Sequence, residues 1–268
     1  MKTISTFAAL MAWTVLAGAQ SRDCATLSHS LLQVSGFALA LDDFSRTANS
    51  DEFMKQLPGV AQNDSKFLAV FKPIVAKQFG GDLMKKAVET RLRARCKPAQ
   101  MSEALARLRT PSIGRMLALE AEATTPAGKD KIRKYAQIYQ IAPPPEDRLD
   151  AVSALDQSSG LTDFTVDSII AVMRGMLSGS IGDSELAEQL QDYRTSMRTQ
   201  VQTGVQLSLL ATYHGVTKAD LRQYARELNS EPLKTVYAQM KQSMLEVFEE
   251  RARAAGEDLR VQTAPKSD

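Results

Sequence analysis

Few side chains in this chain could act as nucleophiles, general bases or metal ligands. It contains two histidines, His29 and His214, and two cysteines, Cys24 and Cys96. A Ser-His-Asp or Cys-His arrangement would have to recruit one of these two histidines. His214 precedes Gly215 at an expected helix end, where a capping role is favoured by the helix dipole. No H-E-x-x-H motif, glycine-rich phosphate loop or EF-hand spacing occurs in the sequence.

The acidic clusters do not form a pattern typical of catalysis either. Asp183, Glu185 and Glu188 mark the start of an expected helix, and Glu249 with Glu250 indicates a solvated face. Three further glutamates, at positions 103, 120 and 122, have no partner that the sequence identifies. We therefore expect no catalytic, cofactor or metal site. An enzyme, such as a hydrolase with an unidentified site, is the minority interpretation.

The first nineteen residues resemble a secretory signal peptide. Lys2 supplies the positive start, residues 7–16 form the apolar run, and Ala17-Gly18-Ala19 is a small-residue cleavage site. Cleavage between Ala19 and Gln20 is expected to give an exported protein, periplasmic or secreted. The apolar run is too short for a permanent membrane helix, and no later stretch is long and apolar enough to span one.

Export determines how the two cysteines are interpreted. In an oxidising compartment, Cys24 and Cys96 are most simply a disulfide. A redox or metal site is the competing interpretation, but there is no C-x-x-C motif and only His29 lies near Cys24 in the sequence.

Composition bounds the class of protein. The chain has 268 residues, of which 44% are hydrophobic and 24% charged, as in ordinary globular proteins. Its net charge of +2 provides no basic field for nucleic acid.

Apolar residues recur at helical spacing nearly everywhere after residue 26, which predicts an all-α, multihelical fold without a sheet. Asp51 to Leu57 is an expected short helix, and the alternate arginines 91, 93 and 95 are expected on a solvated face. The prolines after Ala142 predict a boundary. The expected organisation is a signal peptide (1–19), a first helical unit (20–140), a proline-rich linker (141–147), a second unit (148–256) and a flexible tail (257–268).

Each unit contains a short helix, a capped corner and a longer helix. In the second unit, Thr217 and Asp220 form a start like a capping box. Ser230, just before Pro232, is the expected cap of the helix after the corner. In the first unit, Thr110 is the expected N-cap and Pro111 the first helical residue. Met101, Leu108 and Thr110 recur 120 residues later as Leu221, Leu228 and Ser230. This correspondence predicts a divergent tandem duplication.

The corner residues resemble a secreted bacterial family. Thr217, Asp220-Leu221, Leu228 and Ser230 are similar to the S-x-x-E-L … F-Y-x-S-P-x-G unit of domain of unknown function 2059. The first unit keeps Thr110-Pro111 and Gly114-Arg115, whereas the second has Pro232 displaced and Lys234 where glycine is expected. The match covers about forty residues in each half. It implies a small helical envelope protein, often duplicated, and supplies no catalytic residues.

The last helix distinguishes two functional hypotheses. Its apolar stripe is expected to pack against the helix from Leu186 to Leu209 and to form core; the stripe comprises Leu233, Val236, Tyr237, Met240, Met244, Val247 and Phe248. This favours a non-enzymatic structural or partner-binding protein of the bacterial cell envelope. The alternative is a periplasmic carrier or holdase that binds an apolar ligand or an unfolded segment between its helices. Its cleft would lie beside this helix and be lined by methionines such as Met173, Met176, Met197, Met240 and Met244.

Overall fold

The computed structural model describes residues 23–50 and 65–263, and this part of the chain is helical with no strand. The all-α prediction is confirmed. Ser178 and Ile181, in the turn after α10 (Leu161–Leu177), form an isolated β-bridge. The predicted signal peptide, its cleavage site at Ala19 and Gln20, and the predicted helix from Asp51 to Leu57 lie outside the described residues.

Glycine and proline mark several of the breaks between helices. The first helix, Asp23–Val34, meets α2 at a bend of 66°. Gly36 sits at this bend with φ of 80°, a conformation that costs a residue with a side chain more than glycine. Pro111 opens α7 and Pro126 opens α8, where the missing N–H removes no helical hydrogen bond. In chain order the helices after the first are α2 (Phe37–Ala48), α4 (Ser65–Gln78), α5 (Gly81–Ala94), α6 (Pro98–Leu108), α7 (Pro111–Ala123), α8 (Pro126–Ile141), α9 (Glu146–Ser159), α10 (Leu161–Leu177), α11 (Asp183–Thr212), α12 (Lys218–Leu228) and α13 (Leu233–Thr263).

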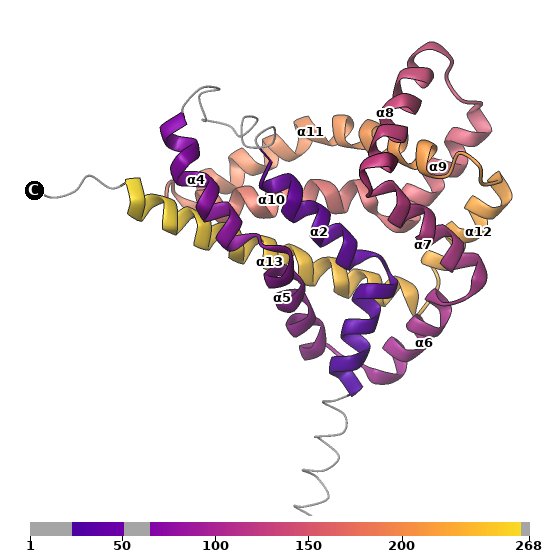
Figure 1. Ribbon diagram of the computed structural model, residues 1–268, viewed down its shortest axis with the longest axis horizontal. Coiled ribbons are helices and arrows are strands. Elements are labelled where there is room, and N and C mark those ends of the chain that lie inside the picture. The colour runs from indigo at the N-terminus through magenta and orange to yellow at the C-terminus, as the bar shows by residue number, and fades with distance from the viewer. Residues whose placement is uncertain (1–22, 51–64, 264–268) are drawn as a thin grey trace, which may run out of the picture.

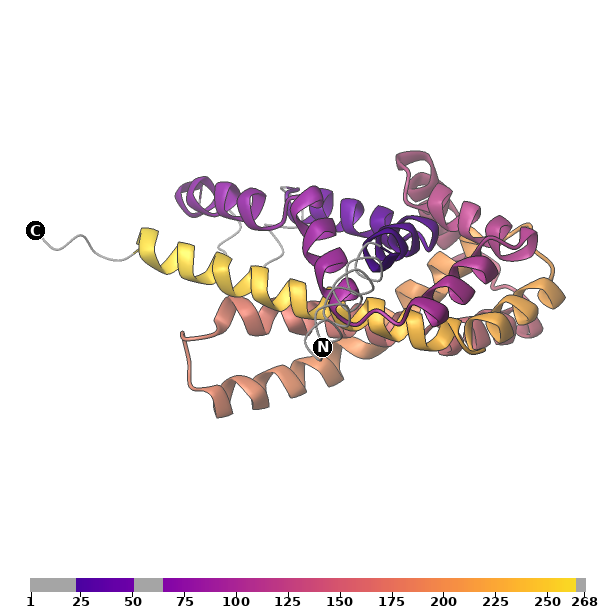
Figure 2. The same ribbon diagram turned by 90° about the horizontal axis from the view of Figure 1, so that it is seen from below.

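The last helix, α13, runs through the middle of the molecule (Figure 1). In Figure 2 it lies between a layer formed by α2, α4 and α5 and a second layer formed by α10 and α11. Its contacts with α4, α5, α6 and α10 agree with this arrangement. As predicted, most of its apolar stripe is core, because Val236, Met240 and Val247 are fully buried.

The partner predicted for α13 is wrong: α10 packs along it, and α11 packs on α10 instead. Two glycines allow the close crossing of α10 and α13. A Cβ atom at Gly175 would lie 2.4 Å from the carbonyl oxygen of Glu249, and one at Gly256 would lie 2.5 Å from that of Met176. The spacing of apolar residues does not show where a glycine lets two helices approach closely. The apolar stripe of α11 therefore predicted the wrong partner for α13.

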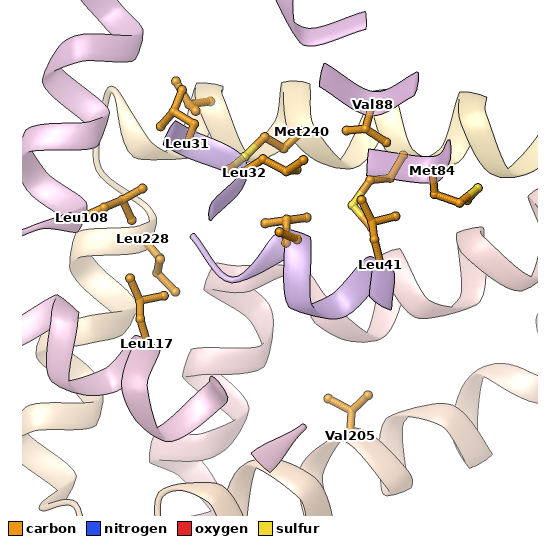
Figure 3. Close-up of a cluster of buried hydrophobic side chains, with 14 of the residues drawn as sticks. Leu31, Leu32, Leu41, Met84, Val88, Leu108, Leu117, Val205, Leu228 and Met240 are labelled. Atoms are coloured by element: carbon orange, nitrogen blue, oxygen red, sulfur yellow. The ribbon is translucent and has the colours of Figure 1, made fainter. Parts of the chain in front are cut away.

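Both predicted units contribute to one core. Buried residues on either side of the prolines belong to the same contiguous cluster, in which Met240 of α13 lies beside Leu32 of the first helix (Figure 3). Figure 3 also shows Leu108 and Leu228, which the predicted duplication treats as equivalent, next to each other. The connection between α8 and α9 spans only Ala142 to Pro145, shorter than the predicted linker.

Ion pairs attach α5 to α13. Arg95 binds Glu246 at 2.6 Å, and Arg91 binds Glu246 and Glu250 at 3.1 and 2.5 Å. These hydrogen bonds and charges hold the pKa of Glu246 below its ordinary value, with the bond from Arg95 as the main cause. The expectation of a solvated face is therefore wrong for these two arginines.

The helical end of the chain extends further than predicted. Residues 257–263, assigned to a flexible tail, continue α13, while residues 264–268 lie outside the described part. Asp258 accepts hydrogen bonds from Lys77 and Gln78 at 2.9 and 3.0 Å, and Arg260 donates to the carbonyl of Ser178 at 2.8 Å. These contacts with α4 and the end of α10 fix the last turns.

Among the described residues, no single helix has both the length and the apolar character needed to cross a membrane. The helices Asp23–Val34 and Phe37–Ala48, which meet at a bend, have the required length and apolar composition only when the two are taken together.

Candidate functional site

The predicted cysteine pair is joined in the structure. The Sγ atoms of Cys24 and Cys96 are 2.13 Å apart and their Cα atoms 5.8 Å apart, inside the range expected for a disulfide. The bond ties the start of the first helix to the segment between α5 and α6.

The two corner regions predicted from the sequence meet in space. Arg107 at the end of α6 donates to the hydroxyl of Ser230 at 3.2 Å and lies 4.0 Å from the carboxylate of Glu227. Arg115 of α7 pairs with Asp220 of α12 at 2.9 Å. α6 also contacts α13, and α12 contacts α7, although α12 packs mainly on α9. Residues 105 and 123 positions apart in the chain thus meet on one surface.

The corner residues differ in how they cap. Thr217 accepts a hydrogen bond from the backbone N–H of Asp220 at 3.1 Å, which is the predicted N-cap. Pro111 occupies the first turn of α7, also as predicted. The hydroxyl of Thr217 and the guanidinium of Arg115 hold the pKa of Asp220 below its ordinary value.

Thr110 and Ser230 do not make the side-chain caps that the sequence predicts. Thr110 precedes α7, but its hydroxyl donates to the carbonyl of Arg107 at 2.7 Å. Ser230 donates in the same way to the carbonyl of Glu227 at 2.6 Å. Each hydroxyl sits three residues past an acceptor at the end of the preceding helix, and there it satisfies a free carbonyl. The two side chains therefore close the helix before the corner rather than open the helix after it.

A groove of about 310 Å³ lies between the start of α7 and the outer face of α12. Ile113, Met116 and Tyr224 line it with largely buried apolar groups. The other lining residues are Pro111, Ser112, Arg115, Asp220, Gln223 and Glu227. A hollow of this size accommodates one or two large side chains, and the surrounding polar groups could orient what enters.

A carboxylate lies behind the groove. Tyr224 donates a hydrogen bond to Glu120 of α7 at 2.9 Å, and Tyr213, at the end of α11, donates to the same oxygen. Burial raises the pKa of Glu120, and the two tyrosine hydrogen bonds oppose this shift. Burial, and secondly the charge of Glu120, raises the pKa of both Tyr213 and Tyr224. The hydroxyl of Tyr237 on α13 is also buried and has no hydrogen-bond partner among the described residues.

The sequence did not predict the cluster of Glu120 with Tyr213 and Tyr224, because only folding brings these three residues together. Glu120 is separated from Tyr213 by 93 residues and from Tyr224 by 104. Its one local signal is a glutamate among apolar residues in a helix, next to Leu117 and Leu119, which indicates an acid facing inward.

The histidines are placed on different helices and are not brought into this cluster. Nδ1 of His29 lies 2.7 Å from the carboxylate of Glu89 on α5. The ring of His214 lies 4.6 Å from that of Tyr135 on α8, and Tyr213, not His214, is the C-cap of α11. Within residues 23–50 and 65–263, no group of three or more His, Cys, Asp or Glu side chains could hold a metal ion.

The methionines that a carrier would need are divided between core and partly buried positions. Met240 and Met244 are buried, with 0% and 2% of their surfaces exposed. Met176 packs against the main core, and Met173 and Met197 pack against a smaller cluster between α10 and α11. None of the five lines the groove between α7 and α12.

Comparison with known proteins found no matching family model, no matching curated protein and no matching solved structure.

Proposed function

We propose that this chain is an exported, non-enzymatic helical protein of the bacterial cell envelope that binds a partner protein. The groove between α7 and α12 carries the proposal. It combines an apolar floor with charged groups on both sides, an arrangement typical of a pocket that receives an anchor side chain of a partner. Export is inferred from residues 1–19 and from the disulfide, which persists in oxidising compartments.

The packing around the groove supports a preformed binding surface. Tyr224 is buried at 3% exposure, and its hydroxyl is held by Glu120, so the floor cannot rotate freely. The Arg115–Asp220 pair joins one wall to the other. A surface that is already ordered loses less conformational entropy when a partner binds.

The duplication and the assignment to domain of unknown function 2059 are part of this proposal. They rest on the corner residues, and the reciprocal contacts of α6 with α13 and of α12 with α7 are what two equivalent units facing each other would make. The carrier hypothesis would need a methionine-lined cleft beside α13. Since Met240 and Met244 are buried, we carry forward the partner-binding hypothesis.

A bulky residue placed in the groove tests the proposal. Ser112 is the exposed second residue of α7 and lines the groove, whereas Ser184 is the exposed second residue of α11 and does not. We expect Ser112→Trp to abolish chemical crosslinking to envelope proteins that the parent chain and Ser184→Trp both retain. The proposal is wrong if all three proteins crosslink the same partners equally, or if no partner crosslinks to the parent chain.

A further inference from the structure

The outward face of α8 combines exposed apolar and basic side chains. Ile138 and Ile141 are 52% and 87% exposed, and Gly128 is the buried residue of this helix. Lys131 and Lys134 precede them at spacings of three, four and three residues, which places all four on one side of a helix. The helix thus has a stripe that begins with two lysines and ends with two isoleucines.

Positive charge on this stripe is not fully neutralised. Lys129 pairs with Asp43 at 2.5 Å, and Arg133 pairs with Asp130. Lys131 lies 3.7 Å from Glu122, in a pair with both side chains about half exposed. Lys134 makes no ion pair with any described residue. An exposed pair contributes little, so the stripe presents a net positive surface beside its isoleucines.

The stripe stands at a projecting part of the molecule. α8 contacts α7 and α11 with its other side, and the ring contact between Tyr135 and His214 belongs to that packing. Its C-terminal end and the turn into α9 extend beyond the neighbouring helices at the upper right of Figure 1, and Figure 2 shows the same projection. Ile141 lies at this tip, followed by the exposed Pro143 and Pro145.

We propose that this face of α8 binds the surface of an anionic phospholipid bilayer. The isoleucines would enter the boundary between headgroups and acyl chains, while the lysines remain at the level of the phosphates. Each lysine near an anionic surface adds attraction that salt weakens. A convex tip suits a flat, deformable surface, whereas a protein partner would need a matching concavity. This inference does not depend on the groove between α7 and α12.

Flotation with lipid vesicles tests the proposal on the purified mature chain without residues 1–19, because the apolar run of those residues would itself bind lipid. Parent protein is mixed with vesicles of phosphatidylcholine alone, or of phosphatidylcholine with phosphatidylglycerol. We expect weak, salt-sensitive binding to the anionic vesicles only. The double variant Ile138→Ser, Ile141→Ser should lower the bound-to-free ratio by about tenfold or more, since two exposed apolar side chains are lost. Lys134→Gln should lower it by about fivefold.

Matched variants distinguish vesicle binding by this face from non-specific binding by exposed apolar or basic side chains elsewhere. Leu177 and Val261, 37% and 78% exposed at the other end of the molecule, provide the apolar control as the double variant Leu177→Ser, Val261→Ser. Lys234→Gln, an exposed lysine of α13, provides the charge control. Every comparison uses the same mature chain, so binding by other segments is common to all variants. Equal melting temperatures show that each variant is folded.

Three outcomes would overturn the proposal. Parent protein could fail to bind anionic vesicles, or it could bind them equally well with and without the α8 substitutions. The control variants could also lose as much binding as the α8 variants. Loss of a protein crosslink by the α8 variants, without vesicle binding by the parent, would assign this face to an acidic protein surface instead.

Discussion

At the scale of single residues, Glu120 is the side chain with the least ordinary surroundings. It joins α7 to Tyr213 and Tyr224, and its carboxylate is removed from water. Burial raises its pKa in the folded protein above the ordinary value of 4.5. The folded state therefore holds this proton more tightly than the unfolded state. The free energy of unfolding should decrease as pH rises from about 4.5 through the raised pKa.

Glu120→Gln tests this argument. Glutamine keeps an acceptor for the tyrosine hydroxyls but carries no charge, so stability at pH 7 should be unchanged or higher. The decrease in the free energy of unfolding with rising pH should also become smaller. Urea unfolding at pH 5 and pH 8 measures both effects. Glu122→Gln is the matched control, because Glu122 is exposed on the same helix. Glu120→Ala should instead destabilise by about 2 kcal/mol or more, because it leaves two buried hydroxyls without their acceptor. Identical pH profiles for the parent and Glu120→Gln would contradict the assignment.

At the scale of elements, the crossing of α10 and α13 depends on glycines. An alanine at Gly175 or Gly256 would place its Cβ atom within 2.6 Å of backbone oxygens, which cannot move without separating the helices. We expect Gly175→Ala and Gly256→Ala each to destabilise by about 1–3 kcal/mol, as overpacking does. Gly204 lies inside α11 with no atom within 4 Å of the added Cβ, so Gly204→Ala should stabilise by about 0.5–1 kcal/mol. Thermal melts of the three variants measure the contrast, and a gain in stability for all three would show that the crossing is looser than described.

At the scale of the whole molecule, the disulfide restricts a large part of the chain. Cys24 and Cys96 are separated by 72 residues. Closing a loop of this length reduces the entropy of the unfolded state, which raises its free energy by about 4 kcal/mol at room temperature. The double variant Cys24→Ala, Cys96→Ala should lose up to that amount in urea unfolding.

The native parent should react with no thiol reagent, since these are its two cysteines. Its intact mass after export should lack the first nineteen residues and two hydrogens. A labelled thiol in the exported protein would exclude the bond.

The sequence by itself determined the helices and several of the helix ends. A helix depends on residues three and four apart, and proline and glycine act on the backbone where they stand, so these signals are local. The breaks at Gly36 and Gly160 and the start of α7 at Pro111 follow from them. The cysteine pairing was predictable because the chain has only two cysteines.

Tertiary structure decided which helices pack together and which polar groups meet. The closeness of α10 and α13 comes from missing side chains at Gly175 and Gly256, which an apolar pattern does not record. Thr110 and Ser230 show the same limit, since a hydroxyl at a corner can serve the helix before it or the helix after it. Tyr224 donates a hydrogen bond to Glu120, and Arg115 pairs with Asp220, only because two corners 120 residues apart face each other. Contacts between distant residues depend on the arrangement of whole helices, and that arrangement is set by the packing of all of them at once.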